Sequence, residues 1–392
     1  MKRMRHLIIF CMGLFLIGTL TMNTTVTYAK ETTQDLAENA KAAILIDRDT
    51  GKIIYEKNMD EQLPPASMTK IMTLLLVMEA IDTGELSYDE KIVISENASS
   101  MGGSQVFLEA GEEMTVNDLI KAVAIASGND ASVALAERLA GSEKAFAEKM
   151  NDKAKELGLK NTSFHNASGL PEDDHHSTAH DMAMIAKELL KYEQITKYTS
   201  IYEDYLREGN ENEFWLVNTN KLVHFYPYVD GLKTGYTSEA KFSLTATAKK
   251  NDMRLISVVM GADSTKKRNR MTMEMIDYGF SHYEVEKLYE RNEQVGELKM
   301  LQSEKYCYPV KTSEQISTLH EAGDKAKEVE PEITIKQPDK LPLEKGETVG
   351  EITIRDGKET RTSPLVLDEE LKPASYYQLW KRSLSHIAKK VE

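Results

Sequence analysis

The sequence is poor in cysteine: only Cys11 and Cys307 occur among its 392 residues. Cys11 lies in an N-terminal segment that we expect to be removed, so the mature chain keeps one cysteine, which excludes an internal disulfide. The neighbours of Cys307 favour a strand; they are Tyr306, Tyr308 and Pro309. We expect the Cys307 side chain to be a small apolar core residue rather than a reactive thiol.

The sequence also has little that could cross a membrane, because its apolar run at 7–20 is shorter than the roughly 20 residues that a span needs. The basic start 1–5 precedes this run, and the small polar residues 27–29 follow it. These are the three regions of a secretory signal peptide, so we expect residues 1–29 to be cleaved after Ala29. The protein is therefore expected to be exported, either to the outer face of the cytoplasmic membrane and the cell wall or into the medium. A retained N-terminal anchor is the less favoured alternative.

Positive charge is in deficit, with 49 Lys and Arg against 63 Asp and Glu, a net charge of −14. Removal of the leader takes away Lys2, Arg3 and Arg5, so the mature chain carries −17 (−14 minus 3). A surface this acidic argues against nucleic acid as a partner, because phosphate binding needs basic patches. The length of the chain favours two domains.

The first two thirds of the chain alternate between helical and strand patterns. Strands are predicted at 42–47 and 53–56, and again at 231–237, 241–249 and 253–261, the last two joined as an antiparallel hairpin. Between them, helices are predicted from Ser67, from a capping pattern at Thr115 to 126, over 130–139 and 146–157, and from a second capping pattern at Thr178 to 190. Helices between two groups of strands predict an α+β domain, with helices packed on an antiparallel sheet.

The composition and the hydrophobic pattern of the sequence change near residue 283. Residues 284–370 are rich in Glu and Lys and contain short alternating runs, such as 332–336 and 351–355, which predict a small all-β domain. Residues 371–392 predict a basic amphipathic helix, which we expect to lie on an anionic membrane surface; packing on the protein's own second domain is the alternative. Its apolar stripe comprises Tyr376, Trp380, Leu384, Ile387 and Val391, and Lys381, Arg382, Lys389 and Lys390 lie off the stripe.

Ser67 and Lys70 stand at the start of a helix that is otherwise almost wholly apolar. Burial disfavours an ammonium group, so we expect Lys70 to release its proton more easily than an exposed lysine. Residues three apart share a helix face, so the Lys70 amine can reach the Ser67 hydroxyl. A serine beside a desolvated amine is a nucleophile beside its base.

Two further stretches make this pair specific. Ser127-Gly128-Asn129 interrupts two predicted helices with small polar residues, and Lys233-Thr234-Gly235 lies on a predicted strand. Gly235 leaves room for another backbone to approach. The three motifs Ser-x-x-Lys, Ser-x-Asn and Lys-Thr-Gly occur in this order after the export signal. Ser127 lies 60 positions after Ser67, and Lys233 lies 106 positions after Ser127.

With these motifs the chain resembles the penicillin-binding D-alanyl-D-alanine carboxypeptidases, relatives of the serine β-lactamases. The resemblance extends over 166–170, 177–183 and 218–222 and covers nearly the whole exported chain. It implies a transpeptidase-like catalytic domain at 30–283, followed by the β domain and the terminal helix. It also implies a peptidoglycan stem peptide ending in D-Ala-D-Ala as substrate, with no cofactor and no metal.

The resemblance assigns catalytic roles to Ser67 as acyl-ester nucleophile, Lys70 as general base and Ser127 as proton relay to the departing D-Ala. The backbone N–H groups of Ser67 and Tyr236 would form the oxyanion hole. Some members have histidine where this chain has Tyr236, so the role of that side chain stays open.

The same resemblance assigns substrate binding to a second group of residues. Asn129 would orient the peptide amide, and Lys233 and Thr234 would bind the terminal carboxylate with help from Arg268. Gly235 would belong to the same binding strand. A β-lactam would acylate the serine, and its hydrolysis should be slow, because the Glu-x-x-x-Asn loop of one β-lactamase class is not apparent at 171–178.

Three alternatives remain open at this stage. His175, His176, His180 and Asp181 could form a metal site, with His176 and His180 on one helix face, although no His-Glu-x-x-His sequence is present. A non-catalytic wall-binding or penicillin-sensing protein could keep the same fold, and a β-lactamase is the nearest neighbour within the enzymes.

Overall fold

The computed structural model describes residues 35–324, 329–356 and 359–389. The expected signal peptide at 1–29 and the last three residues of the expected terminal helix lie outside these ranges. Over the ranges described, none of the helices combines the length and the apolarity that a bilayer span would require.

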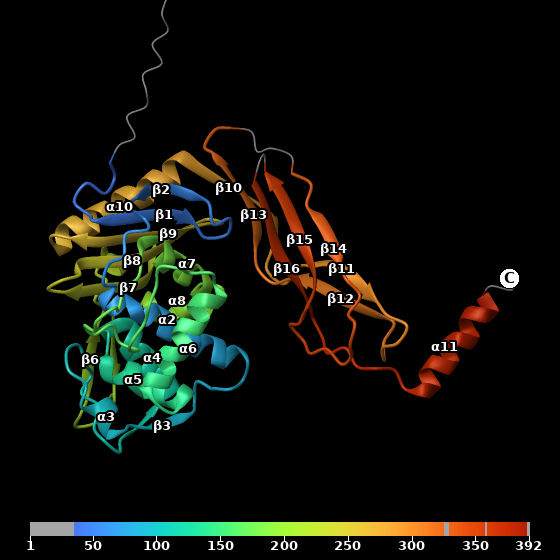
Figure 1. Ribbon diagram of the computed structural model, residues 1–392, viewed down its shortest axis with the longest axis horizontal. Coiled ribbons are helices and arrows are strands. Elements are labelled where there is room, and N and C mark those ends of the chain that lie inside the picture. Colours follow the sequence, from blue (N-terminus) through green and yellow to red (C-terminus); the bar gives the residue numbers. More distant parts are fainter. Residues whose placement is uncertain (1–34, 325–328, 357–358, 390–392) are drawn as a thin grey trace, which may run out of the picture. The chain divides into compact units, whose positions relative to one another are not determined.

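A five-stranded antiparallel sheet forms the centre of the first domain, with the strand order β2-β1-β9-β8-β7 (Figure 1). All five strands predicted for this domain are confirmed, and β7 lies at the edge of the sheet. The strands are β1 (Ala42–Asp47), β2 (Ile53–Lys57), β7 (Val229–Thr237), β8 (Lys241–Lys250) and β9 (Met253–Ala262).

Both faces of this sheet are covered, because side chains alternate along each strand. In β1, Ile44 and Ile46 belong to one core cluster, whereas Ala43 and Leu45 belong to another. Helix α10 (Thr265–His282), which the sequence patterns did not predict, covers the second cluster. Figure 1 shows α10 on one side of the sheet and the remaining helices of the domain on the other.

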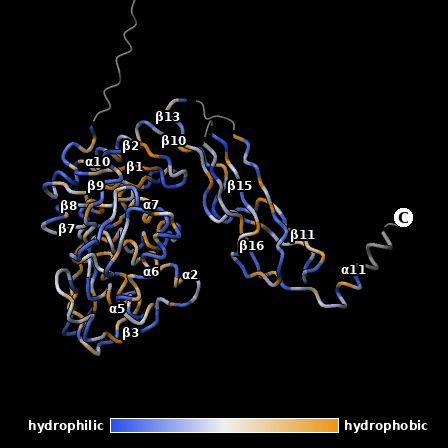
Figure 2. Tube along the Cα trace, in the orientation of Figure 1, coloured by the Kyte–Doolittle hydropathy of each residue, from blue (hydrophilic) through white to orange (hydrophobic). Residues whose placement is uncertain are grey.

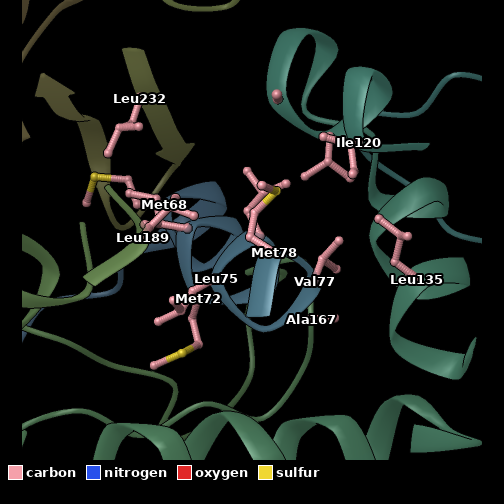
Figure 3. Close-up of a cluster of buried hydrophobic side chains, with 14 of the residues drawn as sticks. Met68, Met72, Leu75, Val77, Met78, Ile120, Leu135, Ala167, Leu189 and Leu232 are labelled. Atoms are coloured by element: carbon pink, nitrogen blue, oxygen red, sulfur yellow. The ribbon is translucent and has the colours of Figure 1, made fainter. Parts of the chain in front are cut away.

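The helical layer is organised around α2 (Lys70–Asp82), whose apolar side chains form the centre of the larger core cluster (Figure 3).

Both predicted caps are confirmed: the side chains of Thr115 and Thr178 accept backbone N–H groups from Asp118 and Asp181. The other elements are η1 (Ala66–Thr69), α3 (Glu96–Ser99), α4 (Val116–Lys121), η2 (Ala122–Ala126), α5 (Asn129–Ala140), α6 (Glu143–Glu156), α7 (Ala179–Leu189), η3 (Glu193–Ile195), α8 (Thr196–Thr199), α9 (Leu222–Phe225) and the two-stranded pairs β3 (Lys91–Val93) with β4 (Glu113–Thr115) and β5 (Glu203–Leu206) with β6 (Phe214–Val217).

Two predicted helices depart from regular α geometry beside the catalytic motifs. The helix expected from Thr115 to 126 becomes the π-helical turn η2 after Lys121, and it ends at Ser127. The helix expected from Ser67 begins as the 3₁₀ turn η1, and α2 starts at Lys70. Irregular helical turns of this kind often occur at functional sites.

The second domain is all-β, as predicted. Figure 2 shows hydrophobic and hydrophilic residues alternating along its strands, and the buried ones form a separate core cluster. A five-stranded sheet has the order β11-β12-β16-β15-β14, and β10 pairs with β13. The strands are β10 (Tyr283–Tyr289), β11 (Gln294–Lys299), β12 (Cys307–Thr312), β13 (Ile316–Glu321), β14 (Glu332–Ile335), β15 (Thr348–Asp356) and β16 (Glu359–Leu367).

The expectation for Cys307 is half right. It lies on a strand, β12, but its side chain is only half-buried, whereas Tyr308 and Val310 enter the core. Because the period of a strand is two, the burial of Tyr308 directs Cys307 to the opposite face. The prediction of a core cysteine is therefore wrong.

A helix is present at the end of the chain, α11 (Tyr376–Lys389). Tyr376, Tyr377 and Trp380 are exposed on it. The side chains of Leu384 and Ile387, and the whole of Val391, lie outside the described part of the structure.

Candidate active site

Ser67 and Lys70 meet as the spacing predicts. Ser67 lies in η1 and is half-buried, and Lys70 opens α2 and is fully buried. The Lys70 Nζ lies 3.1 Å from the Ser67 Oγ. The turn and the helix thus place an amine at hydrogen-bond distance from a hydroxyl that is partly open to solvent.

Two carbonyl oxygens also surround the Lys70 amine. The Nζ donates to the Asn129 Oδ1 at 2.6 Å and to the Ser168 backbone oxygen at 2.6 Å. Neither acceptor can donate, so two N–H bonds of Lys70 must point at them. In the neutral amine the remaining position is a lone pair, which is left to face the Ser67 hydroxyl.

The surroundings of Lys70 favour that neutral form. Burial lowers its pKa well below the ordinary value of 10.5, and the nearby positive charge of Lys233 lowers it further. Asp130 and Glu143 act in the opposite direction, but more weakly. The balance favours the neutral amine over the ammonium, and the neutral amine is the form that can accept a proton.

Ser127 follows the π-helical turn η2 in a left-handed conformation, with φ 65° and ψ 31°. Non-glycine residues adopt this region uncommonly, and such residues often occur at functional sites. The Ser127 Oγ is buried and forms no hydrogen bond within the part of the chain that the structure describes. A buried hydroxyl without a partner is available for a bound substrate.

Both polar atoms of the Asn129 side-chain amide form hydrogen bonds. Its Oδ1 accepts from Lys70, and its Nδ2 donates to the Gly102 backbone oxygen at 2.7 Å. The backbone N–H of Asn129 donates to the Ser104 oxygen at 2.7 Å. One hydrogen of the Nδ2 group is not used by these contacts. The resemblance assigned this residue to the amide of a substrate.

Strand β7 brings Lys233, Thr234 and Gly235 against the turn at residues 65–70, which contains Ser67 and Lys70 and is named the catalytic turn after their proposed roles. A β-carbon at Gly235 would lie 2.6 Å from the Pro65 oxygen, so only glycine permits this approach. Lys233 is buried, and burial lowers its pKa to about 7, with a further contribution from the charge of Arg268. The Thr234 hydroxyl donates to the Thr219 Oγ1 at 2.8 Å.

Arg268 and Tyr236 differ in their exposure. Arg268 lies in the first turn of α10, is 3% exposed, and donates to the backbone oxygen of Ser243 and to the Oδ1 of Asn269. It therefore adds a buried positive charge close to Lys233. The Tyr236 side chain is 57% exposed, and its ring packs on Phe242 with the ring centroids 4.6 Å apart.

A segment to which the sequence patterns gave no role completes the site. Asn166 organises it, because its Oδ1 accepts backbone N–H groups from Ser168 and Gly169. A β-carbon at Gly169 would lie 1.9 Å from the Ala66 oxygen. The family resemblance included the stretch 166–170 without a role, and no role for Ser168 could be found from its identity, because it contributes a backbone oxygen, which every residue has.

A cavity of about 330 Å³ adjoins the catalytic turn. It is lined by residues 62–66, directly before Ser67, by the segment 169–176, by Thr237 at the end of β7 and by Glu239. The cavity therefore lies beside the residues that precede Ser67, at the end of β7.

The histidine segment is arranged differently from the metal-site alternative. His176 precedes α7 and pairs its backbone with Ser163, so it does not share a helix face with His180. His180 contacts Asp181, and the His175 ring lies 2.8 Å from the Thr69 hydroxyl. Within the described ranges, no three His, Cys, Asp or Glu residues are grouped to hold a metal ion.

Comparison with known families gives two matches. Residues 28–264 match the model of the D-alanyl-D-alanine carboxypeptidase family, Peptidase_S11, which is more than half of the chain. Residues 283–373 match the model of the C-terminal domain of penicillin-binding protein 5.

Individual relatives agree with these matches. The chain is 53% identical over 358 residues to D-alanyl-D-alanine carboxypeptidase DacF of Bacillus subtilis, covering 91% of this chain and 92% of the relative. The structure of penicillin-binding protein 5 from Haemophilus influenzae is similar with a TM-score of 0.65 and 29% identity, covering 85% of this chain and 98% of that one. Penicillin-binding protein D2 from Listeria monocytogenes in the ampicillin-bound form has a TM-score of 0.56 and 34% identity, covering 62% and 98% of the two chains.

Proposed function

Because this chain belongs to the D-alanyl-D-alanine carboxypeptidase family and is a serine-type peptidase, we propose that it is exported and shortens peptidoglycan stem peptides through an acyl-enzyme on Ser67. The single observation that carries the mechanism is the environment of the Lys70 amine. Two carbonyl oxygens take two of its N–H bonds, and the third direction points at the Ser67 hydroxyl.

The first half of the reaction forms the acyl-enzyme. The Ser67 Oγ attacks the carbonyl carbon of the penultimate D-Ala while Lys70 takes the hydroxyl proton. Negative charge develops on the carbonyl oxygen, where the N–H groups of Ser67 and Tyr236 stabilise it; each such donor typically contributes about 3 kcal/mol. The C–N bond then breaks, and the proton held by Lys70 passes through the Ser127 hydroxyl to the departing D-Ala nitrogen. Its unpartnered oxygen supports this assignment.

Three groups recognise the end of the peptide. The terminal carboxylate meets the buried positive charges of Lys233 and Arg268 and the hydroxyl of Thr234. A carboxylate supplies the negative charge that two buried cations need, so its binding raises the pKa of Lys233 from about 7 toward its ordinary value. The remaining N–H of Asn129 binds the peptide amide, and the cavity beside Pro65 and Glu239 receives the residues upstream of D-Ala-D-Ala.

Water completes the reaction by releasing the shortened peptide from Ser67. A β-lactam acylates the same oxygen, and its four-membered ring opens in place of the loss of D-Ala. Penicillin-binding protein D2 from Listeria monocytogenes, whose structure is similar to that of this chain, binds ampicillin. We expect this chain to release the penicilloyl group slowly and therefore to be inhibited.

The terminal helix gives the exported enzyme a place at the membrane surface. Tyr376 and Trp380, which begin the apolar stripe of the sequence, are 93% and 62% exposed. Exposed aromatic residues on a basic amphipathic helix suit the interface of an anionic bilayer. The helix lies on the bilayer in this proposal and does not cross it.

One experiment tests the enzymatic proposal. The protein is incubated with diacetyl-Lys-D-Ala-D-Ala and, separately, with a fluorescent penicillin, and the products are followed by mass spectrometry. Free D-Ala and a label on Ser67 are expected, and Ser67→Ala should abolish both. If the label forms while D-Ala is never released, the protein is a penicillin-binding sensor and not a carboxypeptidase. Activity lost on EDTA treatment but retained with penicillin would indicate a metal enzyme.

A further inference from the structure

His175 has no part in the proposed chemistry, yet it contacts the catalytic turn. It lies in the segment before α7, 6% exposed, and its Nε2 is 2.8 Å from the Thr69 Oγ1. Thr69 stands between Ser67 and Lys70 in the sequence and is fully buried. The imidazole therefore contacts the side chain of the residue that stands between Ser67 and Lys70 in the chain.

The hydrogen bonds around His175 fix the role of each ring nitrogen. The backbone N–H of His165 donates to the Nδ1 at 3.2 Å, so the Nδ1 is an acceptor. The hydrogen of the neutral ring is then on the Nε2, which donates to Thr69. Burial lowers the pKa of His175 to about 4, with smaller contributions from His165 and His176, so the ring is neutral at physiological pH.

The same segment also holds the base. The Ser168 oxygen accepts from the Lys70 Nζ at 2.6 Å, and the Ala167 oxygen accepts from the Thr73 hydroxyl at 2.7 Å. Together with the His175 contact, these bonds attach the segment 165–175 to η1 and α2 at three points. A shift of the segment would change the distance between Lys70 and its carbonyl partner.

We propose that His175 is a positioning residue for the reaction, acting through Thr69; this inference rests on the proposed function. Its hydrogen bond keeps the catalytic turn in register with the segment that carries the Ser168 oxygen. In that register two N–H bonds of Lys70 are engaged and its lone pair faces Ser67. Without the bond the turn and the segment separate, water reaches Lys70, and the amine becomes easier to protonate.

The first test compares three variants of the full-length chain. His175→Phe keeps an aromatic ring but removes both hydrogen bonds, and we expect the rate of acylation by a fluorescent penicillin at pH 7 to fall roughly tenfold. His175→Gln can still donate to Thr69 and accept from His165, and it should stay within about twofold of the original rate. His282→Gln is the matched control, because the His282 ring lies outside the cavity and contacts Tyr278 at the end of α10.

The second test separates positioning from a general loss of structure. Hydration of Lys70 raises its pKa, so the acid limb of the acylation rate against pH should move upward by about half a unit or more in His175→Phe. The charged groups that act on Lys70, namely Lys233, Asp130 and Glu143, are the same in every variant. Thr69→Val should reproduce the shift, and the double variant should be no slower than either single one, because both remove one hydrogen bond.

Two results would overturn the inference. One is a His175→Phe protein with the original rate and pH profile. The other is a slower protein whose profile is unshifted and whose loss of rate matches its loss of folded protein in a thermal melt. If the unmodified chain neither labels with penicillin nor releases D-Ala, the proposed function fails instead, so the two failures can be told apart.

Discussion

Gly235 of β7 and Pro65 of the catalytic turn approach so closely that a β-carbon on residue 235 would lie 2.6 Å from the Pro65 oxygen. The same atom would lie 3.2 Å from the Cγ of Met68. The binding strand therefore touches the turn that carries the nucleophile, and no side chain fits between them. Under the proposed function, this contact sets how closely β7, which would bind the peptide, approaches Ser67 and therefore limits the cleft between them.

Replacing this glycine should separate the strand from the turn. We expect Gly235→Ala to lower the rate of penicillin acylation by roughly tenfold or more and to destabilise the fold by about 1–3 kcal/mol, because the extra methyl group has no room. Stopped-flow acylation and a thermal melt measure the two effects. An unchanged rate and melting temperature would mean that the contact does not restrict the cleft.

Replacement of Gly169 by alanine should impair the protein as much as replacement of Gly235, and Gly158→Ala is a matched control. In Gly169→Ala the β-carbon would lie 1.9 Å from the Ala66 oxygen, at a glycine with φ +80°. Gly158 has φ +73° but nothing within 4 Å of a β-carbon, so Gly158→Ala measures the conformational strain alone. We expect Gly158→Ala to be folded and active and Gly169→Ala to lose soluble protein or acylation, as gel filtration and labelling would show. Equal behaviour of the two variants would contradict the steric argument.

We expect Ser127→Ala to lower the release of D-Ala while leaving the stability of the fold almost unchanged. The Ser127 Oγ has no hydrogen-bond partner among the described residues, so its removal leaves none of their polar groups unsatisfied, and alanine has the same β-carbon at φ 65°. The melting temperature should stay within about 1 °C, while the release of D-Ala falls about a hundredfold with the loss of the proton relay. A variant that melts much earlier would show that the hydroxyl has a structural role.

Lys233→Met should stabilise the fold and abolish binding of the terminal carboxylate. Burial lowers the pKa of Lys233 from 10.5 to about 7, so between these pH values the unfolded chain binds more protons than the folded one. The lysine therefore destabilises the fold most at pH 7 and below, by a few kcal/mol, and less as the pH rises toward 10.5.

Thermal melts of both proteins from pH 7 to pH 9.5 test this sign. The variant should melt several degrees higher at pH 7, and the gap should narrow as the pH rises. Turnover of the D-Ala-D-Ala peptide should be nearly lost at every pH, because the carboxylate loses a cation. If the difference in melting temperature between the two proteins instead widened with pH, the pKa of Lys233 in the folded chain would not be lowered, contrary to this prediction.

The terminal helix provides a prediction at the membrane. Trp380→Ala, and more strongly a chain that ends at 374 and so lacks α11, should sediment less with anionic lipid vesicles, since exposed apolar area and basic charge supply the binding. Release of D-Ala from a soluble peptide should be unchanged in both. Equal sedimentation of all three proteins with anionic and with neutral vesicles would exclude a membrane role for the helix.

Several elements of the fold followed from local sequence patterns. The strands of the central sheet, the caps at Thr115 and Thr178 and the break at Ser127 depend on residues within a few positions of one another. Helix α10 was missed, although Ser264 caps it by accepting from the Lys267 N–H. The face of β12 on which Cys307 lies was also missed, because it depends on which neighbour enters the core.

The sequence by itself determined which chemistry the site can contain. The three-residue spacing of Ser67 and Lys70 is a local property of one turn, and the three motifs together indicate the family. Only the tertiary structure decided how the amine is oriented: its partners Asn129 and Ser168 are 59 and 98 residues away, and the His175 contact to Thr69 spans 106 residues. Such contacts depend on packing, and one of them is made by a backbone oxygen, which carries no residue identity for a sequence to reveal.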